Sequence, residues 1–348
     1  MGNELPDPAW RSWHGSLIAL ANGDTGSVGQ RFLREWLPGA RLPSEFGRFV
    51  AERHSDLDRT KPLGEVRELE LPAYSGGHAG VRAIHDLLTP HVGNNLVFAC
   101  VHGSFGAGDS IPYSDFDGLV VVADSAMQNA DQLWAVSRDL VRARQIMYQL
   151  DPLQHHGWFV LPEAAVEAWP EDYLPLVTLQ RAQALGVTES ISLKVHHTLD
   201  VYRLRSQLDG MASAILQELE QDRYLQGMYQ LKSTLSKIML LPCLLLQALR
   251  EIGVEKKDSF AEAAPLFSES EWQAIEVASA VRAAWPEIPC RVPVLRKRVG
   301  PVGTAIRKKG SGAVRPEIRN VLGSEFPVQA RIFIETMRGQ LTAEKSDH

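Results

Sequence analysis

The chain has 348 residues, 45% of them hydrophobic, and a net charge of −6 at pH 7, which is typical of a folded protein of two domains and excludes a disordered chain. The longest apolar run, residues 238–246, is too short to cross a bilayer and contains Pro242, so we expect a core helix and no membrane association. Three widely spaced cysteines without zinc-site spacing, together with an N-terminus that lacks signal-peptide features, favour the cytoplasm.

Residues 1–76 form an N-terminal extension that we expect to be mostly helical, with one helix near 29–36 and another near 44–53. Its content of Trp, Pro and Gly indicates no function. A helix over 78–88 then leads through a turn into an apolar strand over 96–101.

The segment after this strand carries the motif from which function can be argued. Gly103 and Ser104 form a turn, and after a short loop Asp115 and Asp117 introduce a second apolar strand over 118–122. Side chains two residues apart on a strand share a face, so we expect the two carboxylates about 6–7 Å apart. Like charges that close need a cation between them, and oxygen ligands suit Mg²⁺, or Mn²⁺ in its place, completed by substrate phosphates.

The order of strand, Gly-Ser turn and Asp-x-Asp resembles the signature of the DNA polymerase beta-type nucleotidyltransferases. The resemblance covers roughly residues 78–161. It implies an α+β fold in which residues 77–170 form the catalytic core, a small mixed β-sheet with helices on one face. A mainly α-helical domain would follow this core.

The resemblance also implies a set of site residues. Asp115 and Asp117 would hold two Mg²⁺ ions and the triphosphate of an NTP, with ATP as the favoured donor. Gly103 lets the backbone approach the phosphates, and the hydroxyl of Ser104 can donate to a phosphate oxygen. We also expect Ser114, which directly precedes Asp115, to bind the nucleotide.

A helix over 126–150 is followed by a predicted third strand over 154–161, where the resembled family supplies one more carboxylate. No Asp or Glu lies in that strand. Three alternatives follow: Asp151 supplies the carboxylate from the leading edge of the strand, His156 acts as general base, or the site works with two acids or is inactive.

Residues 171–348 are predicted to form the helical domain. Its periodic stretches are 191–220, 223–251, 258–266, 270–284 and 316–342. Lys232 and Ser236 share a helix face one turn apart, and Lys257 lies at the start of the next helix. The resemblance implies that such lysines and serines hold the triphosphate, whereas a solvated lysine or a helix cap is the alternative for each.

Residues 291–319 carry nine Lys and Arg against one acid, a local charge of +8 that leaves −14 for the rest of the chain. We expect a basic loop, rich in Gly and Pro, that contacts RNA or a triphosphate. The alternative is a solvated linker whose charges keep it extended.

Two functions from different classes follow from these patterns. The first is a Mg²⁺-dependent transferase that moves a nucleoside monophosphate, AMP in the favoured case, from an NTP to a hydroxyl of an unidentified acceptor and releases pyrophosphate. The acceptor would be a small molecule, an RNA or a protein. The second is a catalytically silent protein of the same fold that binds a nucleotide or RNA. The motif favours the first, and the missing third carboxylate favours the second.

Overall fold

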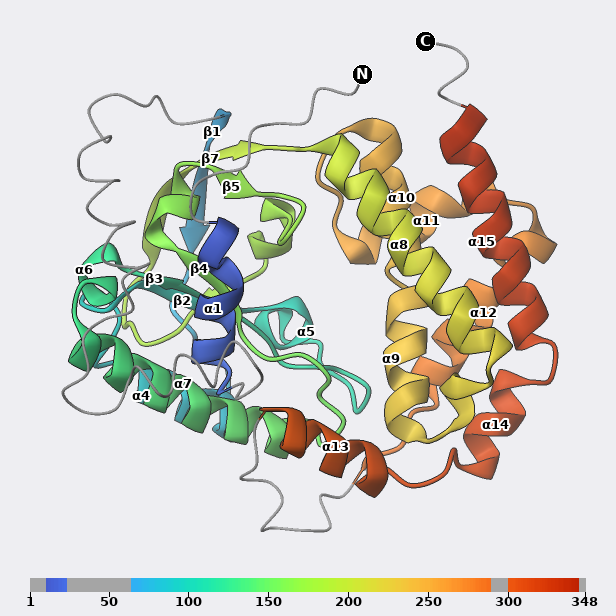
Figure 1. Ribbon diagram of the computed structural model, residues 1–348, viewed down its shortest axis with the longest axis horizontal. Coiled ribbons are helices and arrows are strands. Elements are labelled where there is room, and N and C mark those ends of the chain that lie inside the picture. The colour runs from blue at the N-terminus through green and yellow to red at the C-terminus, as the bar shows by residue number, and fades with distance from the viewer. Residues whose placement is uncertain (1–10, 24–63, 289–299, 344–348) are drawn as a thin grey trace.

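The computed structural model describes residues 11–23, 64–288 and 300–343 (Figure 1). Its strands are β1 (Glu65–Leu71), β2 (Leu96–His102), β3 (Asp117–Val122), β4 (Phe159–Pro162), β5 (Trp169–Pro170), β6 (Gln183–Ala184) and β7 (Ile191–Thr198). Its α-helices are α1 (Arg11–Ala21), α4 (Ala79–Leu88), α5 (Gly103–Ala107), α6 (Asp124–Met127), α7 (Ala130–Leu150), α8 (Val201–Glu220), α9 (Met228–Ile238), α10 (Leu241–Arg250), α11 (Lys256–Ala263), α12 (Glu269–Ala283), α13 (Gly300–Gly310), α14 (Pro316–Leu322) and α15 (Phe326–Ala343). The helices predicted near 29–36 and 44–53 lie outside the described residues.

The predicted α+β class is confirmed by a four-stranded mixed sheet in the order β4-β3-β2-β6. β3 is antiparallel to β2 and parallel to β4. The third strand is shorter than predicted, because β4 begins only at Phe159 and residues 154–158 form a loop. In this loop the side-chain amide of Gln154 makes hydrogen bonds with the backbone N–H and carbonyl of Phe116. If the strand continued, its main chain would make these bonds instead.

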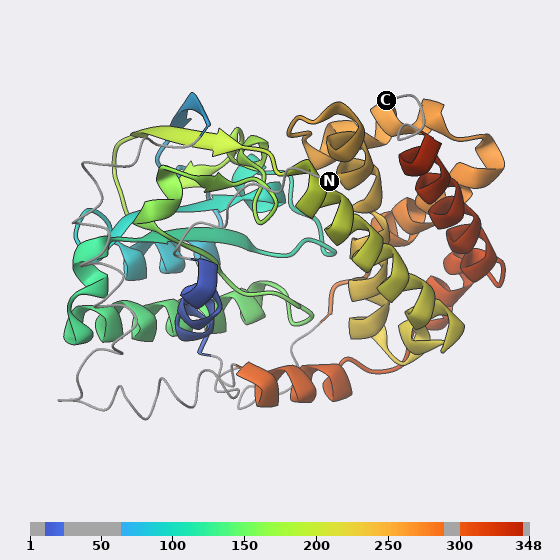
Figure 2. The same cartoon turned by 45° about the horizontal axis from the view of Figure 1, so that its top comes forward.

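The helices α4 and α7 cover one face of this sheet, as predicted. In α4 the residues Val81, Ile84 and Leu88 recur at helical spacing and are buried. α7 packs beside α4, and both lie on the same side of the strands (Figure 2). The helix predicted over 126–150 is divided into the short α6 and the long α7.

A second sheet, in the order β1-β7-β5, lies beside the first. β7 pairs antiparallel with β1 from Ile191 to His197, so the helix predicted over 191–220 is wrong at its start. Exposed Lys194 and buried Val195 belong to a two-residue alternation, and the helix begins only at Val201, with the side chain of Asp200 as N-cap. The mainly helical part therefore starts later than residue 171, and β1 adds a strand to the extension predicted to be mostly helical.

The helical part surrounds a second hydrophobic core, to which α8, α9, α10, α12, α14 and α15 contribute. The stretch Met228–Arg250 is long and apolar enough to cross a membrane by length and composition, but 78% of its most apolar window is buried. It forms α9 and α10, which pack inside this part of the chain. The core location predicted for residues 238–246 is confirmed.

The basic segment differs from the predicted loop within the residues that the structure describes. Residues 300–310 form α13 and residues 316–322 form α14, because both prolines, Pro301 and Pro316, lie in the first turn of a helix, where the missing N–H costs no hydrogen bond. The Arg307 guanidinium lies 3.7 Å from the centre of the Tyr148 ring on α7. Helix α13 therefore connects the helical part to the helices below the sheet (Figure 2).

Candidate functional site

The two predicted acids lie on either side of Phe116, whose backbone is held by one buried side chain. Asp117 is the first residue of β3, and Asp115 belongs to the preceding loop. The Gln154 amide accepts a hydrogen bond from the Phe116 N–H at 2.8 Å and donates one to the Phe116 carbonyl at 2.9 Å. Gln154 thus fixes the direction of the chain between the two acids. Sequence analysis missed this residue.

His156 lies between the two carboxylates. Its Nε2 is 3.1 Å from Asp117 Oδ1 and 3.6 Å from Asp115 Oδ2. Burial lowers the pKa of His156, but its contacts with Asp115 and Asp117 raise it to about 10, so the ring is protonated at neutral pH. In return, His156 holds the pKa of Asp117 below its ordinary value against the opposing effect of burial. In this arrangement the predicted general base is a cation that neutralises both acids.

The predicted Gly-Ser turn meets Asp117 through the register of β2 and β3, in which His102 pairs with Asp117. Gly103 follows directly, with φ of 61°, and a Cβ at this position would overlap the Asp117 carboxylate. Ser104 is half-buried in the first turn of α5, and its hydroxyl has no hydrogen-bond partner in the described part of the chain. Only glycine permits this close approach of turn and acid.

Replacing Gly103 by Ala is expected to lower stability more than replacing Gly108 by Ala. Both glycines have positive φ, 61° and 74°, and each alanine pays about 1–2 kcal/mol for that backbone conformation. A Cβ at Gly108 meets nothing within 4 Å, whereas at Gly103 it displaces the carboxylate of Asp117. Urea unfolding of both variants measures the difference in the free energy of unfolding. Equal losses of this free energy would mean that a Cβ at position 103 does not displace the Asp117 carboxylate.

A buried lysine from the helical part holds two acids of the sheet part. Lys232 on α9 is fully buried, and its Nζ lies 2.8 Å from Asp115 Oδ1 and 2.6 Å from Asp151 Oδ2. Burial lowers the pKa of Lys232, but the two carboxylates together raise it above the ordinary value. Burial also raises the pKa of Asp151, to about 7, while Lys232 opposes that shift. Lys232 is thus placed between acids rather than on an open surface.

Asp151, the candidate third carboxylate, has both oxygens engaged. It is the C-terminal cap residue of α7, and its Oδ1 accepts a hydrogen bond from the Leu153 N–H at 2.9 Å while Oδ2 faces Lys232. The same lysine, with the nearby histidines, holds the pKa of Asp115 well below its ordinary range although burial alone would raise it. Asp151 therefore joins the site through Lys232.

His155 is a site residue that sequence analysis missed. Its Nδ1 lies 3.4 Å from Asp115 Oδ2, and this buried nitrogen has no hydrogen-bond partner within the described residues. Burial lowers the pKa of His155 to about 4, so the ring is neutral at neutral pH. The doubled histidine was the available signal. In a strand the two rings would face opposite sides, but in the loop both reach Asp115.

Two of the three serines assigned to the nucleotide, Ser114 and Ser236, already make hydrogen bonds within the chain. Ser114 Oγ accepts a bond from the Ile111 N–H at 3.0 Å, and the Ser236 hydroxyl lies 2.9 Å from the hydroxyl of Tyr113. Tyr113 also donates to the Lys232 carbonyl at 2.9 Å and belongs to the core of the helical part. The loop before the acids is therefore anchored in the helical part.

Of the two adjacent lysines at the start of α11, the predicted one pairs with another acid, while the charges of Asp115 and Asp117 act on its neighbour Lys256. The Lys257 side chain is 66% exposed and pairs with Asp109 at 3.2 Å. Lys256 has no such partner among the described residues, and burial lowers its pKa, which the charges of Asp117 and Asp115 oppose. Lys256 is thus a cation available to an anionic ligand near the acids. Sequence spacing alone did not distinguish the two.

The loop that carries the histidines is held by α1. The Asn22 side chain, directly after this helix, accepts from the Trp158 N–H at 2.7 Å and donates to the Trp158 carbonyl at 3.1 Å. A Cβ at Gly157 would overlap the Asn22 side chain, so this position also needs glycine. The N-terminal extension therefore contributes directly to the shape of the site.

Comparison of the chain with models of protein families, with curated proteins and with solved structures finds no match. Asp115 and Asp117 are ionised, and each faces a cation, Lys232 or protonated His156. The two side chains are 12% and 27% exposed, so a charged ligand can reach them from solvent. The arrangement is suited to bind a cation in exchange for the proton on His156.

Proposed function

We propose that the chain is a Mg²⁺-dependent nucleotidyltransferase that moves a nucleoside monophosphate, AMP in the favoured case, from an NTP to a hydroxyl and releases pyrophosphate. The observation that carries the proposal is the meeting of the Gly103 turn with Asp117, with Asp115 beside it. This is the pairing of turn and acids on which the resemblance to the DNA polymerase beta-type enzymes depends. Order in the sequence alone does not require such a contact.

The groups around the acids fit the metal that this proposal needs. Asp115 and Asp117 each turn an oxygen toward the Nε2 of His156, so a divalent cation at that place would replace one positive charge by two. Mg²⁺ is the favoured ion, with two ions expected and Mn²⁺ as the alternative. When bound, such ions lower the pKa of the acceptor hydroxyl and neutralise the leaving pyrophosphate.

The chain's own residues would bind and orient the nucleotide. Gly103 leaves room for a phosphate beside the backbone, and the unengaged hydroxyl of Ser104 donates to a phosphate oxygen. Lys256, whose charge lies near the acids, attracts the triphosphate. Lys232 holds Asp115 in place through its ion pair with Oδ1.

The acceptor would be a small molecule, a protein or an RNA, and basic residues of α13 favour testing RNA first. The proposed location is the cytoplasm. Cys100 and Cys243, the two cysteines within the described residues, are buried free thiols, as expected in a reducing compartment.

The proposal is tested by incubating the protein with Mg²⁺ and each of the four α-labelled NTPs, with and without total cell RNA. The expected result is pyrophosphate release and label on an acceptor with one preferred NTP. Intact binding of the NTP without pyrophosphate release, in Mg²⁺ and in Mn²⁺, would instead support a silent nucleotide-binding protein. The neutralisation of Asp151 by Lys232 and the absence of an acid in β4 favour that second candidate.

A further inference from the structure

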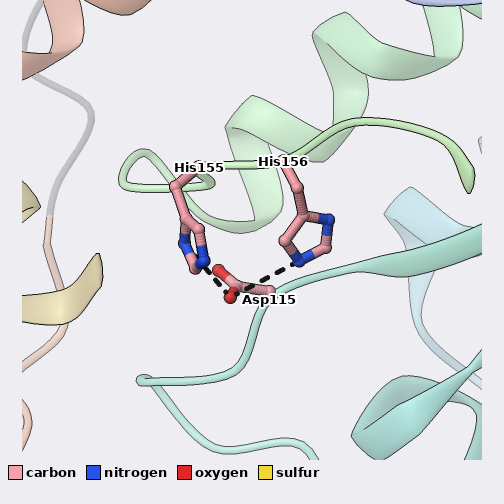
Figure 3. A group of neighbouring side chains, drawn as sticks. All are labelled: Asp115, His155 and His156. Carbon is pink, nitrogen blue, oxygen red and sulfur yellow. Dashed lines mark ion pairs between the residues drawn. The ribbon is translucent and has the colours of Figure 1, made fainter. Parts of the chain in front are cut away.

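Three potential metal-ligand atoms converge beside the pair of acids. Asp115 Oδ2, His155 Nδ1 and His156 Nε2 all lie within 4.8 Å of one another. Figure 3 shows both imidazole rings, from adjacent residues of one loop, directed at the same carboxylate from the facing loop. Two imidazole nitrogens and one oxygen are a different donor set from the two carboxylates to which Mg²⁺ was assigned.

The two separations that involve Asp115 match those between ligands of a tetrahedral ion. Asp115 Oδ2 is 3.4 Å from His155 Nδ1 and 3.6 Å from His156 Nε2, which is longer than an ordinary N–H···O hydrogen bond. Ligands about 2.0–2.1 Å from a tetrahedral Zn²⁺ are ~3.4 Å apart. Ligands of octahedral Mg²⁺ at about the same bond length are only ~2.9 Å apart. The separations therefore fit the first ion better than the second.

Two of the three groups, Asp115 and His156, are oriented by contacts outside the cluster. His156 Nδ1 lies 3.3 Å from the Gly157 carbonyl, so Nε2 points at the acids, and it must give up its proton to bind a metal, as every imidazole ligand does. Lys232 binds Asp115 Oδ1 and leaves Oδ2 facing the histidines. His155 Nδ1 is buried and has no hydrogen-bond partner among the described residues, although a buried polar atom normally has one.

We infer that Asp115, His155 and His156 bind a nitrogen-preferring divalent transition metal of the Zn²⁺ or Co²⁺ class. Three protein ligands leave a fourth position open, as in metal sites that take part in reactions rather than in folding. The side chains are 12%, 22% and 28% exposed, so a water or substrate oxygen can reach that position. This inference goes beyond the proposed function, because the ligand set would hold its ion whether or not the chain transfers nucleotides.

The chain contains a matched control for the histidine pair. His196 and His197 are also adjacent, but they lie in β7, where neighbouring side chains point to opposite faces. His197 faces Glu171, and no group of three metal-ligand atoms forms there within the described residues. If any adjacent pair of histidines bound the metal, His196→Gln would lower the metal affinity as much as His155→Gln.

The test is titration of metal-depleted full-length protein with Co²⁺, followed by visible absorption, with Zn²⁺ then added as competitor. We expect one equivalent to bind with the intense spectrum of tetrahedral Co²⁺, and Zn²⁺ to displace it. His155→Gln should weaken binding by roughly 100-fold or more, and His196→Gln should not change it. The wild-type spectrum tests the geometry even where a variant fails to fold.

A faint octahedral spectrum, no saturable binding, or equal effects of His155→Gln and His196→Gln would overturn the inference. Mg²⁺-supported pyrophosphate release, measured on the same preparation, separates this outcome from failure of the proposed function. Transfer without Co²⁺ binding removes the transition-metal site alone. Co²⁺ binding without transfer removes the transferase proposal alone.

Discussion

Replacing Asp117 by Asn is expected to lower nucleotidyl transfer by about 10³-fold or more. The amide keeps the shape that fits against Gly103 and can still contact His156, but it loses the charge that binds a divalent cation together with Asp115. The defect should therefore appear in the rate with little change in stability. Initial rates of pyrophosphate release at saturating NTP and Mg²⁺, and urea unfolding of the same sample, measure the two quantities.

Asp131→Asn is the matched control for this prediction. Asp131 is an exposed aspartate in the first turn of α7, away from the predicted acids along the chain. The same change of charge there should leave transfer at the wild-type rate. If Asp117→Asn transfers nucleotides as fast as Asp131→Asn, the reaction does not take place at this pair of acids.

Replacing Lys232 by Met is expected to destabilise the fold by about 3–5 kcal/mol at pH 7. The change removes a fully buried charge whose Nζ contacts Asp115 and Asp151, and it leaves two buried carboxylates that repel each other. The free energy of unfolding from urea titration measures the loss. Adding Asp151→Asn to the variant should recover part of it, because one of the unpaired charges is then gone.

Lys237 on the same helix provides the control. Its Nζ makes an ion pair of the same length, 2.6 Å to Glu218 Oε1, but the two side chains are 32% and 22% exposed. Lys237→Met should therefore cost no more than about 1 kcal/mol. Equal losses in Lys232→Met and Lys237→Met would show that burial of the Lys232 pairs has no energetic importance.

The elements that sequence predicted well are those with a strong local pattern. α4 and α7 follow the apolar spacing of helices, and β2 and β3 are short apolar runs bounded by turns. β7 was missed because its alternation of exposed and buried residues lies directly before a long helix, and its partner β1 is distant in the chain. Pairing between distant segments has no local signal.

The site residues, too, were predictable only where a local sequence pattern exists. Asp115, Asp117 and Gly103 could be proposed from order and spacing, since turn, strand and acid are near one another in the sequence. The roles of Gln154 and Lys256 depend on contacts with other segments, and a single glutamine or lysine has no pattern that indicates such contacts.

The buried lysine has a consequence for how the chain folds. Lys232 comes from the helical part, whereas the acids that it binds, Asp115 and Asp151, come from the sheet part. Severed between β7 and α8, the first fragment would expose Tyr113 and would leave Asp115 and Asp151 without the charge of Lys232. The two parts therefore do not fold as independent domains. We expect them to unfold together, in a single cooperative transition.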